Sequence, residues 1–184
     1  AGLPTKYYLI DTDPTVTRAP VQHPLTVGIG KIRAPSRYRD QIVYRSSPYD
    51  LGFYEYSRWA EPPDEMVRRA LKNIAGRSGL FRRADFSDLL PPGMADLILE
   101  GEIVAFDQSV EGEKTYAVCE LSLFLLAAAN SSPLWTFTAS NEVRQEKEGG
   151  FPEAMSAAVR EAIENALLDL DRSGVLGKTK NSNQ

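Results

Sequence analysis

Pairs of carboxylates are the residues of this chain whose spacing could support acid–base chemistry. Glu100 and Glu102 are two positions apart in an expected strand and so share one of its faces, while Asp107 lies close in sequence to Glu111 and Glu113. Two carboxyl groups whose environments separate their pKa values can act as acid and base. Alternating charge is, however, also typical of the solvent side of an antiparallel sheet. We therefore expect these carboxylates to be surface residues without a catalytic role.

Other catalytic and metal-binding patterns are missing from the sequence. The one histidine, His23, stands between prolines in an expected loop, and the one cysteine, Cys119, lies in an alternating apolar run that predicts burial. Gly28-Ile29-Gly30 starts like a dinucleotide-binding fingerprint, but Arg33 occupies the position of the third glycine and no helix follows. The sequence thus predicts a protein that is not an enzyme, with no cofactor and no metal site.

The charge of the chain limits what it can bind. A total of 21 basic against 25 acidic residues gives a formal net charge of −4, which argues against a grip on nucleic-acid phosphates. One expected helix carries a locally basic face, with the candidate patch Arg68, Arg69 and Lys72. A solvated helix face is the favoured interpretation of this patch. If it binds a partner, anionic lipid headgroups or an acidic protein surface fit the overall acidity better than nucleic acid.

Aromatic residues concentrate in one short stretch, where six of the 17 in the chain fall between Tyr44 and Trp59. Extended runs at 42–44 and 53–59 flank turn-forming residues, which predicts a hairpin, and Pro63 can open a helix directly after it. Tyrosine, tryptophan and arginine are enriched at protein interfaces, but a purely structural aromatic cluster is an equally open interpretation. The candidate partner-binding residues are Tyr44, Tyr54, Tyr56, Arg58, Trp59 and Glu61.

Hydrophobic periodicity predicts one layered α+β domain over residues 1–177, followed by a disordered tail over 178–184. Apolar residues at helical spacing predict two long amphipathic helices, at 63–76 and 152–174. Between them, a connector at 77–94 is expected to be tethered to the core. We expect a mixed, largely antiparallel sheet covered by the helices on one or both faces. Its strands are expected at 7–10, 25–33, 96–107, 114–126 and 134–145, besides the hairpin, with an irregular linker at 11–24.

Four short blocks, taken in order along the chain, resemble a known family. They are Tyr7 to Ile10, Val27 to Ile32, Gln41 to Arg45 and, most specifically, Tyr56 to Pro62. In this order and spacing the sequence resembles the auxiliary lipoprotein component of ABC-type transport systems, the PqiC or YmbA-like family. The resemblance implies a fold similar to the N-terminal domain of TolB and to anticodon-binding-like domains.

The resemblance also implies a function. Members are noncatalytic periplasmic lipoproteins that accompany an ABC transporter and an MCE-domain protein in lipid transport between membranes. A lipidated N-terminal cysteine, which the present sequence lacks, would anchor the protein to the outer membrane. We expect the chain to dock such an assembly there, with self-association into a homo-oligomer as a further expectation. The alternative is a carrier that holds a lipid between sheet and helices, in a cavity lined by Leu123, Leu125, Trp135 and Phe137.

Overall fold

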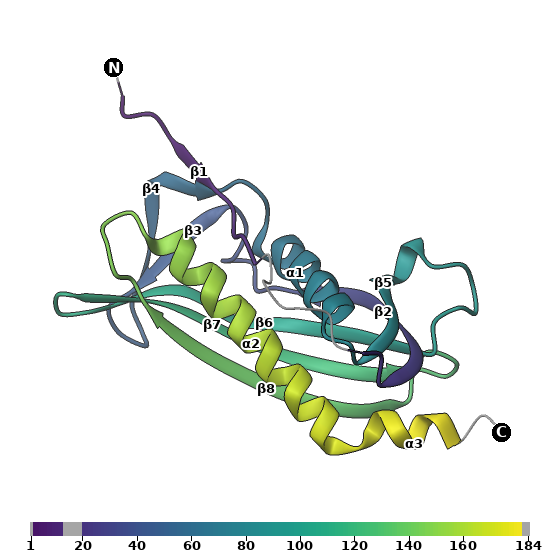
Figure 1. Cartoon of the computed structure of the whole chain (residues 1–184). Coiled ribbons are helices and arrows are strands. Elements are labelled where there is room, and N and C mark those ends of the chain that lie inside the picture. The colour runs from purple at the N-terminus through teal and green to yellow at the C-terminus, as the bar shows by residue number, and fades with distance from the viewer. Residues whose placement is uncertain (1, 13–19, 182–184) are drawn as a thin grey trace.

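The computed structural model describes residues 2–12 and 20–181 of the chain (Figure 1). Part of the predicted linker, residues 13–19, and the last three residues of the predicted tail lie outside the described residues. The strands are β1 (Lys6–Tyr8), β2 (His23–Arg33), β3 (Gln41–Arg45), β4 (Leu51–Trp59), β5 (Phe81–Phe86), β6 (Leu97–Glu111), β7 (Lys114–Ala127) and β8 (Pro133–Arg144). The helices are α1 (Pro63–Arg77), the short 3₁₀ helix η1 (Ser87–Leu89), α2 (Phe151–Ser173) and α3 (Val175–Asn181).

Strand β6 is the central strand of the sheet, because it is long enough to pair with two groups of strands along one of its edges. Its first half pairs in parallel with β2, which continues to β5, and its second half pairs in parallel with β3, which continues to β4 and β1. Along its other edge β6 pairs antiparallel with β7, and β7 with β8. The β3–β4 hairpin and β8 therefore lie on opposite sides of β6 in one mixed sheet.

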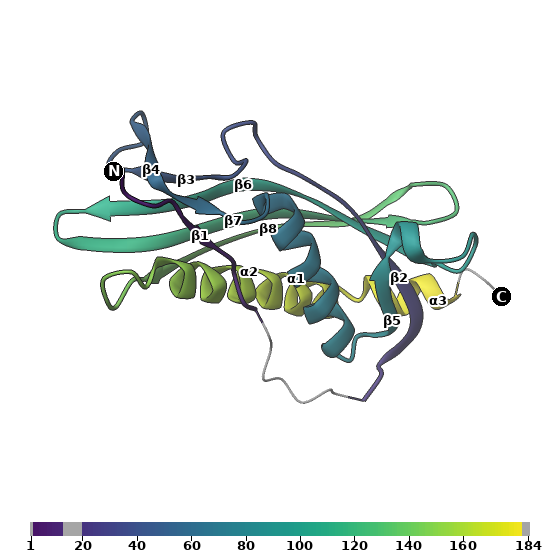
Figure 2. The same cartoon turned by 90° about the horizontal axis from the view of Figure 1, so that it is seen from above.

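Both long helices pack on the same face of the sheet, as Figure 2 shows from above. Helix α2 lies over β7 and β8, and α1 lies over β2 and β5 while also touching α2. In the part of the chain that the structure describes, neither long helix covers the second face. Proline in the first turn opens each long helix, and Gly174, with a φ of 74°, ends α2 in the left-handed conformation that glycine adopts without strain.

The core fills the space between this face and the helices. Strand β7 shows why the sequence folds this way: Cys119, Leu121, Leu123 and Leu125 alternate onto the helix face and are almost fully buried. They meet the apolar stripe of α2, which includes Val159, and burial raises the pKa of the Cys119 thiol. The predicted buried role of Cys119 is confirmed.

The predicted α+β class is confirmed, with both helices on one face, and the structure adds elements that the sequence prediction lacked. The connector contains β5 and η1, and β5 joins the sheet through parallel pairing with β2. At the C-terminus, α3 extends to Asn181, so helix replaces the first part of the tail that was predicted to be disordered from Lys178. None of the described helices is long and apolar enough to cross a bilayer.

Candidate interaction site

The aromatic hairpin divides into two parts because β4 bends away from β3. Gln41 of β3 lies opposite Arg58 of β4, and Val43 of β3 lies opposite Phe53 of β4. Between these two pairs β4 therefore has more residues than β3, which is a shift in register. The first half of β4 stays with β3, and its last three residues pair in parallel with β1. A bulge of this size turns side chains in new directions, and the simple two-face alternation predicted for 53–59 does not hold across it.

Two tyrosines pack together on the first part of the hairpin. The rings of Tyr44 and Tyr54 lie 4.8 Å apart, and the Tyr54 hydroxyl donates a hydrogen bond to the side-chain oxygen of Gln108 on β6. Gln108 in turn donates to Gln145 over 2.9 Å. Gly52 makes room for this cluster, because a Cβ atom at that position would lie 2.3 Å from the Tyr44 ring. Burial, followed by the proximity of Tyr44, raises the pKa of Tyr54.

A buried carboxylate fixes the base of the hairpin to the sheet. Asp107 on β6 accepts a 2.6 Å hydrogen bond from the Tyr38 hydroxyl and a 2.8 Å bond from Nε of Arg45 at the end of β3. The Arg45 guanidinium also donates to the carbonyl of Pro48 in the turn. Burial and then the neighbouring Asp107 raise the pKa of Tyr38. The sequence prediction placed Asp107 on the surface and is wrong there, since its side chain is almost fully buried.

Trp59 ends the hairpin inside the core. Its ring lies 5.4 Å from that of Phe106 and 5.7 Å from that of Phe151 at the start of α2, and only 1% of the residue is exposed. Its backbone N–H donates to the carbonyl of Asp40. Trp59 therefore fastens the hairpin internally and offers no surface to a partner.

The remaining candidate partner-binding residues stay at the surface. Tyr44, Tyr54 and Tyr56 are 36–40% exposed. The Arg58 guanidinium forms a 3.0 Å ion pair with Asp40, and Glu61 pairs with Arg69 of α1. Three half-exposed tyrosines and two charged side chains thus reach the surface along the hairpin and the segment after it, and we call Tyr44, Tyr54, Tyr56, Arg58 and Glu61 the tyrosine surface.

The side chains of the candidate basic patch on α1 form contacts within the protein. Arg68 donates to the carbonyls of Ile29 and Gly30, at the point where the pairing of β2 with β5 ends, and pairs with Asp88 of η1. The ring of Phe86 lies 4.6 Å from the Arg68 guanidinium and 5.2 Å from the Lys72 ammonium. Hydrogen bonding from Arg68 lowers the pKa of Asp88. The three basic residues therefore have intramolecular partners, which leaves them less available to an anionic ligand.

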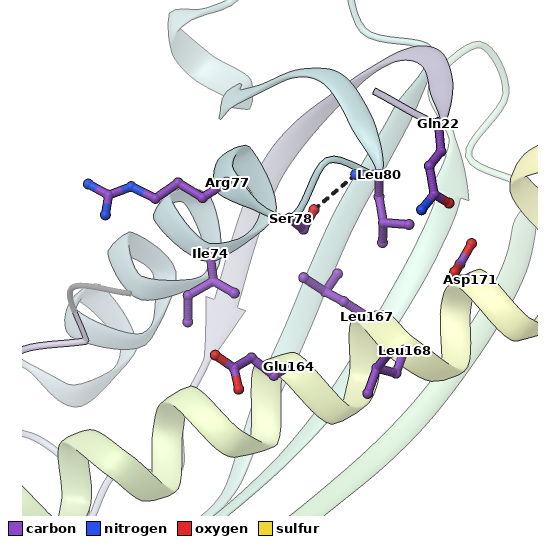
Figure 3. A pocket seen from close by; sticks show the side chains of 9 residues that line it. All are labelled: Gln22, Ile74, Arg77, Ser78, Leu80, Glu164, Leu167, Leu168 and Asp171. Carbon is purple, nitrogen blue, oxygen red and sulfur yellow. Dashed lines mark hydrogen bonds between the residues drawn. The ribbon is translucent and has the colours of Figure 1, made fainter. Parts of the chain in front are cut away.

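A shallow apolar recess lies between the end of α1 and the second half of α2 (Figure 3). It has a volume of about 340 Å³, and Leu80 and Leu167 face each other across it while Glu164 and Asp171 stand at its rim. The residues expected to line a lipid cavity lie elsewhere. Leu123 and Leu125 are packed in the core, and Trp135 stacks on Phe137 and donates to Asp169 of α2.

The remaining sequence candidates do not assemble into a catalytic or metal site. A Cβ atom at Gly30 would lie 2.8 Å from the Glu100 side chain and one at Gly28 3.0 Å from that of Ile98, so both glycines leave room for side chains of β6. His23 lies 4.0 Å from Asp171, near the recess. Among the described residues, no three His, Cys, Asp or Glu side chains gather where they could hold a metal ion.

Comparisons with solved structures show that the fold occurs in other bacterial proteins. A DUF330 protein from Xanthomonas campestris is 17% identical, with a TM-score of 0.78 over 97% of this chain and 99% of that one. A hypothetical protein from Chlamydia trachomatis is 6% identical, with a TM-score of 0.51 over 83% of this chain and 98% of the other. A putative neuraminyllactose-binding hemagglutinin homolog from Helicobacter pylori is 12% identical, with a TM-score of 0.50 over 95% and 98%.

The sequence itself is matched by a family model. No curated protein matches the chain. The model of the ABC-type transport auxiliary lipoprotein component, in contrast, matches residues 7–170, which include the hairpin, α1, the strands from β2 to β8 and most of α2. The chain therefore belongs to the family of ABC-type transport auxiliary lipoprotein components.

Proposed function

We propose that this protein is a noncatalytic periplasmic accessory subunit that docks an ABC transporter and its MCE-domain partner at the outer membrane through the tyrosine surface. The family assignment supports a role as an auxiliary component of a transport system. An acyl anchor at the N-terminus of the native protein would precede β1, which pairs directly with the end of β4. Figure 1 shows β1 beside β4. The anchor would thus hold the tyrosine surface close to the membrane.

The observation that carries this proposal is that contacts within the protein hold the hairpin and its exposed aromatic side chains in place. Tyr54 is held by Gln108 and Tyr44, the base of the hairpin by Asp107, and its end by Trp59. Tyrosines held in place lose little conformational entropy on binding, and they tolerate both water and a protein partner. Arg58 and Glu61 supply the polar rim that interfaces of this kind carry.

The proposal predicts that the MCE-domain partner co-purifies with the wild-type protein but not with a Tyr54→Ala/Tyr56→Ala double variant. Truncation of central aromatic contacts costs interfaces about 2 kcal/mol or more each, which corresponds to at least a tenfold loss of affinity. Leu89→Ala is the matched control, since Leu89 is 64% exposed in η1, away from the hairpin. Unchanged co-purification by a folded double variant would remove the tyrosine surface from the interface.

The carrier function is a second candidate, and the recess between α1 and α2 is the observation in its favour. Its volume is near the lower end of the range of about 300–1,000 Å³ in which ligand pockets fall. Its apolar floor could hold part of one acyl chain. Mass spectrometry of lipids extracted from the purified protein separates the two functions, because a carrier retains stoichiometric lipid and an adaptor does not.

A further inference from the structure

Three strands end the sheet within the part of the chain that the structure describes, and they differ in how well their edges are protected. β1, β5 and β8 each pair with a single neighbour and so present unpaired backbone groups along the other side. β1 has only three residues, and the six residues of β5 include Arg82, Arg83 and Asp85. Short length and charge are devices that discourage a second strand from adding at an edge.

β8 has 12 residues, and its proline and charges lie only near its ends, at Pro133, Glu142 and Arg144. Its middle segment from Leu134 to Asn141 contains no charge, no proline and no glycine. Its register with β7 is regular from Trp135 to Arg144. Among the described residues, the hydrogen bonds between β8 and α2 are made by the side chains of Trp135 and Asn141 on β8 and not by its backbone. An eight-residue edge segment without charge or proline is suited to pairing with another strand.

The residue pattern of β8 is complementary to itself. In an antiparallel pairing about a two-fold axis at Thr138, Thr138 faces its own copy and Thr136 faces Ser140 of the second copy, and such hydroxyl pairs are favourable across strands. On the other face, Phe137 comes opposite Ala139 of the second copy, which sets a large side chain against a small one. Glu142 comes opposite Leu134, so no like charges meet.

We propose that β8 pairs antiparallel with β8 of a second copy of this chain, with the two-fold axis at Thr138, and joins two sheets into one. Because the hairpin lies on the side of β6 away from β8, the dimer presents one tyrosine surface toward each end. Two docking surfaces on one particle raise the effective concentration of the second contact once the first has formed. The pairing itself does not depend on what the tyrosine surface binds.

Charge substitution at the axis tests this pairing. Thr138→Lys and Thr138→Glu each place two like charges opposite one another, so each variant alone is expected to dimerise at least about tenfold more weakly than the wild type. An equimolar mixture of the two variants is expected to recover the dimer, since Lys then faces Glu. The readout is mass by analytical ultracentrifugation over a concentration series, and recovery in the mixture also proves that both variants are folded.

Two outcomes would overturn the proposal. One is a wild-type protein that remains monomeric throughout the concentration series, which would leave the β8 edge free for the strand of a different protein. The other is a wild-type dimer that both single variants retain unchanged, which would place the dimer interface away from β8. Either result leaves the co-purification test of the tyrosine surface unaffected, so the two proposals fail separately.

Discussion

Replacing Trp59 by alanine is expected to lower the free energy of unfolding by about 3–5 kcal/mol, the usual cost of removing a large buried aromatic side chain. Trp59 contacts Phe106 of the sheet and Phe151 of α2, so the truncation opens a cavity where the hairpin, the sheet and the second helix meet. Chemical denaturation followed by circular dichroism measures the change. Tyr49→Ala is the matched control on the same hairpin, because Tyr49 is 95% exposed and its loss should cost little.

This prediction separates two roles that one hairpin could have. If Trp59→Ala weakens partner binding, it does so by loosening the hairpin, and binding is expected to recover under conditions that stabilise the fold. A Trp59→Ala variant as stable as the wild type would contradict the internal role assigned to this residue.

Replacing Asp107 by alanine is expected to destabilise the protein by about 2–3 kcal/mol. The substitution leaves the Tyr38 hydroxyl buried without its acceptor and removes the partner of Arg45, and removal of one member of a buried pair is costly. We place the loss below the 3–5 kcal/mol range of fully buried pairs because the Arg45 side chain keeps some contact with water. Thermal or denaturant unfolding measures the difference.

Asp40→Asn is the control for this second prediction. Asp40 forms an ion pair with Arg58 on the same hairpin, but its side chain is more than half exposed, so the substitution should cost less than about 1 kcal/mol. Equal losses for the Asp107 and Asp40 variants would show that the buried network does not hold the hairpin.

The sequence predicted the elements whose apolar spacing is regular. The stripe from Val67 to Ile74 and the longer one through Val159 each fit a single helix period, and the alternation around Cys119 fits a strand with one buried face. These patterns reflect burial on one side, which is how the helices and the sheet meet. The family resemblance, which rests on four short blocks between Tyr7 and Pro62, is confirmed by the family model.

Features that depend on distant residues could not be predicted in this way. The sequence of β5 is FRRADF, and its polar residues give no local signal for a strand. The strand forms because β2 and α1 lie beside it. Asp107 looks like a surface carboxylate until Tyr38 and Arg45, more than 60 positions away in the chain, converge on it. The register jump in β4 likewise accompanies its pairing with β3 on one side and with β1 on the other, and no local pattern signals it.

The central claim is that the tyrosine surface touches the transport assembly, and site-specific photocrosslinking in the periplasm tests that contact most directly. A photoreactive amino acid replaces Tyr56 in one variant and Leu89 in another, each in the full-length lipoprotein. We predict that the probe at position 56 crosslinks to the MCE-domain partner and that the probe at position 89 does not. A crosslink to that partner from position 89 together with none from position 56 would contradict the claim.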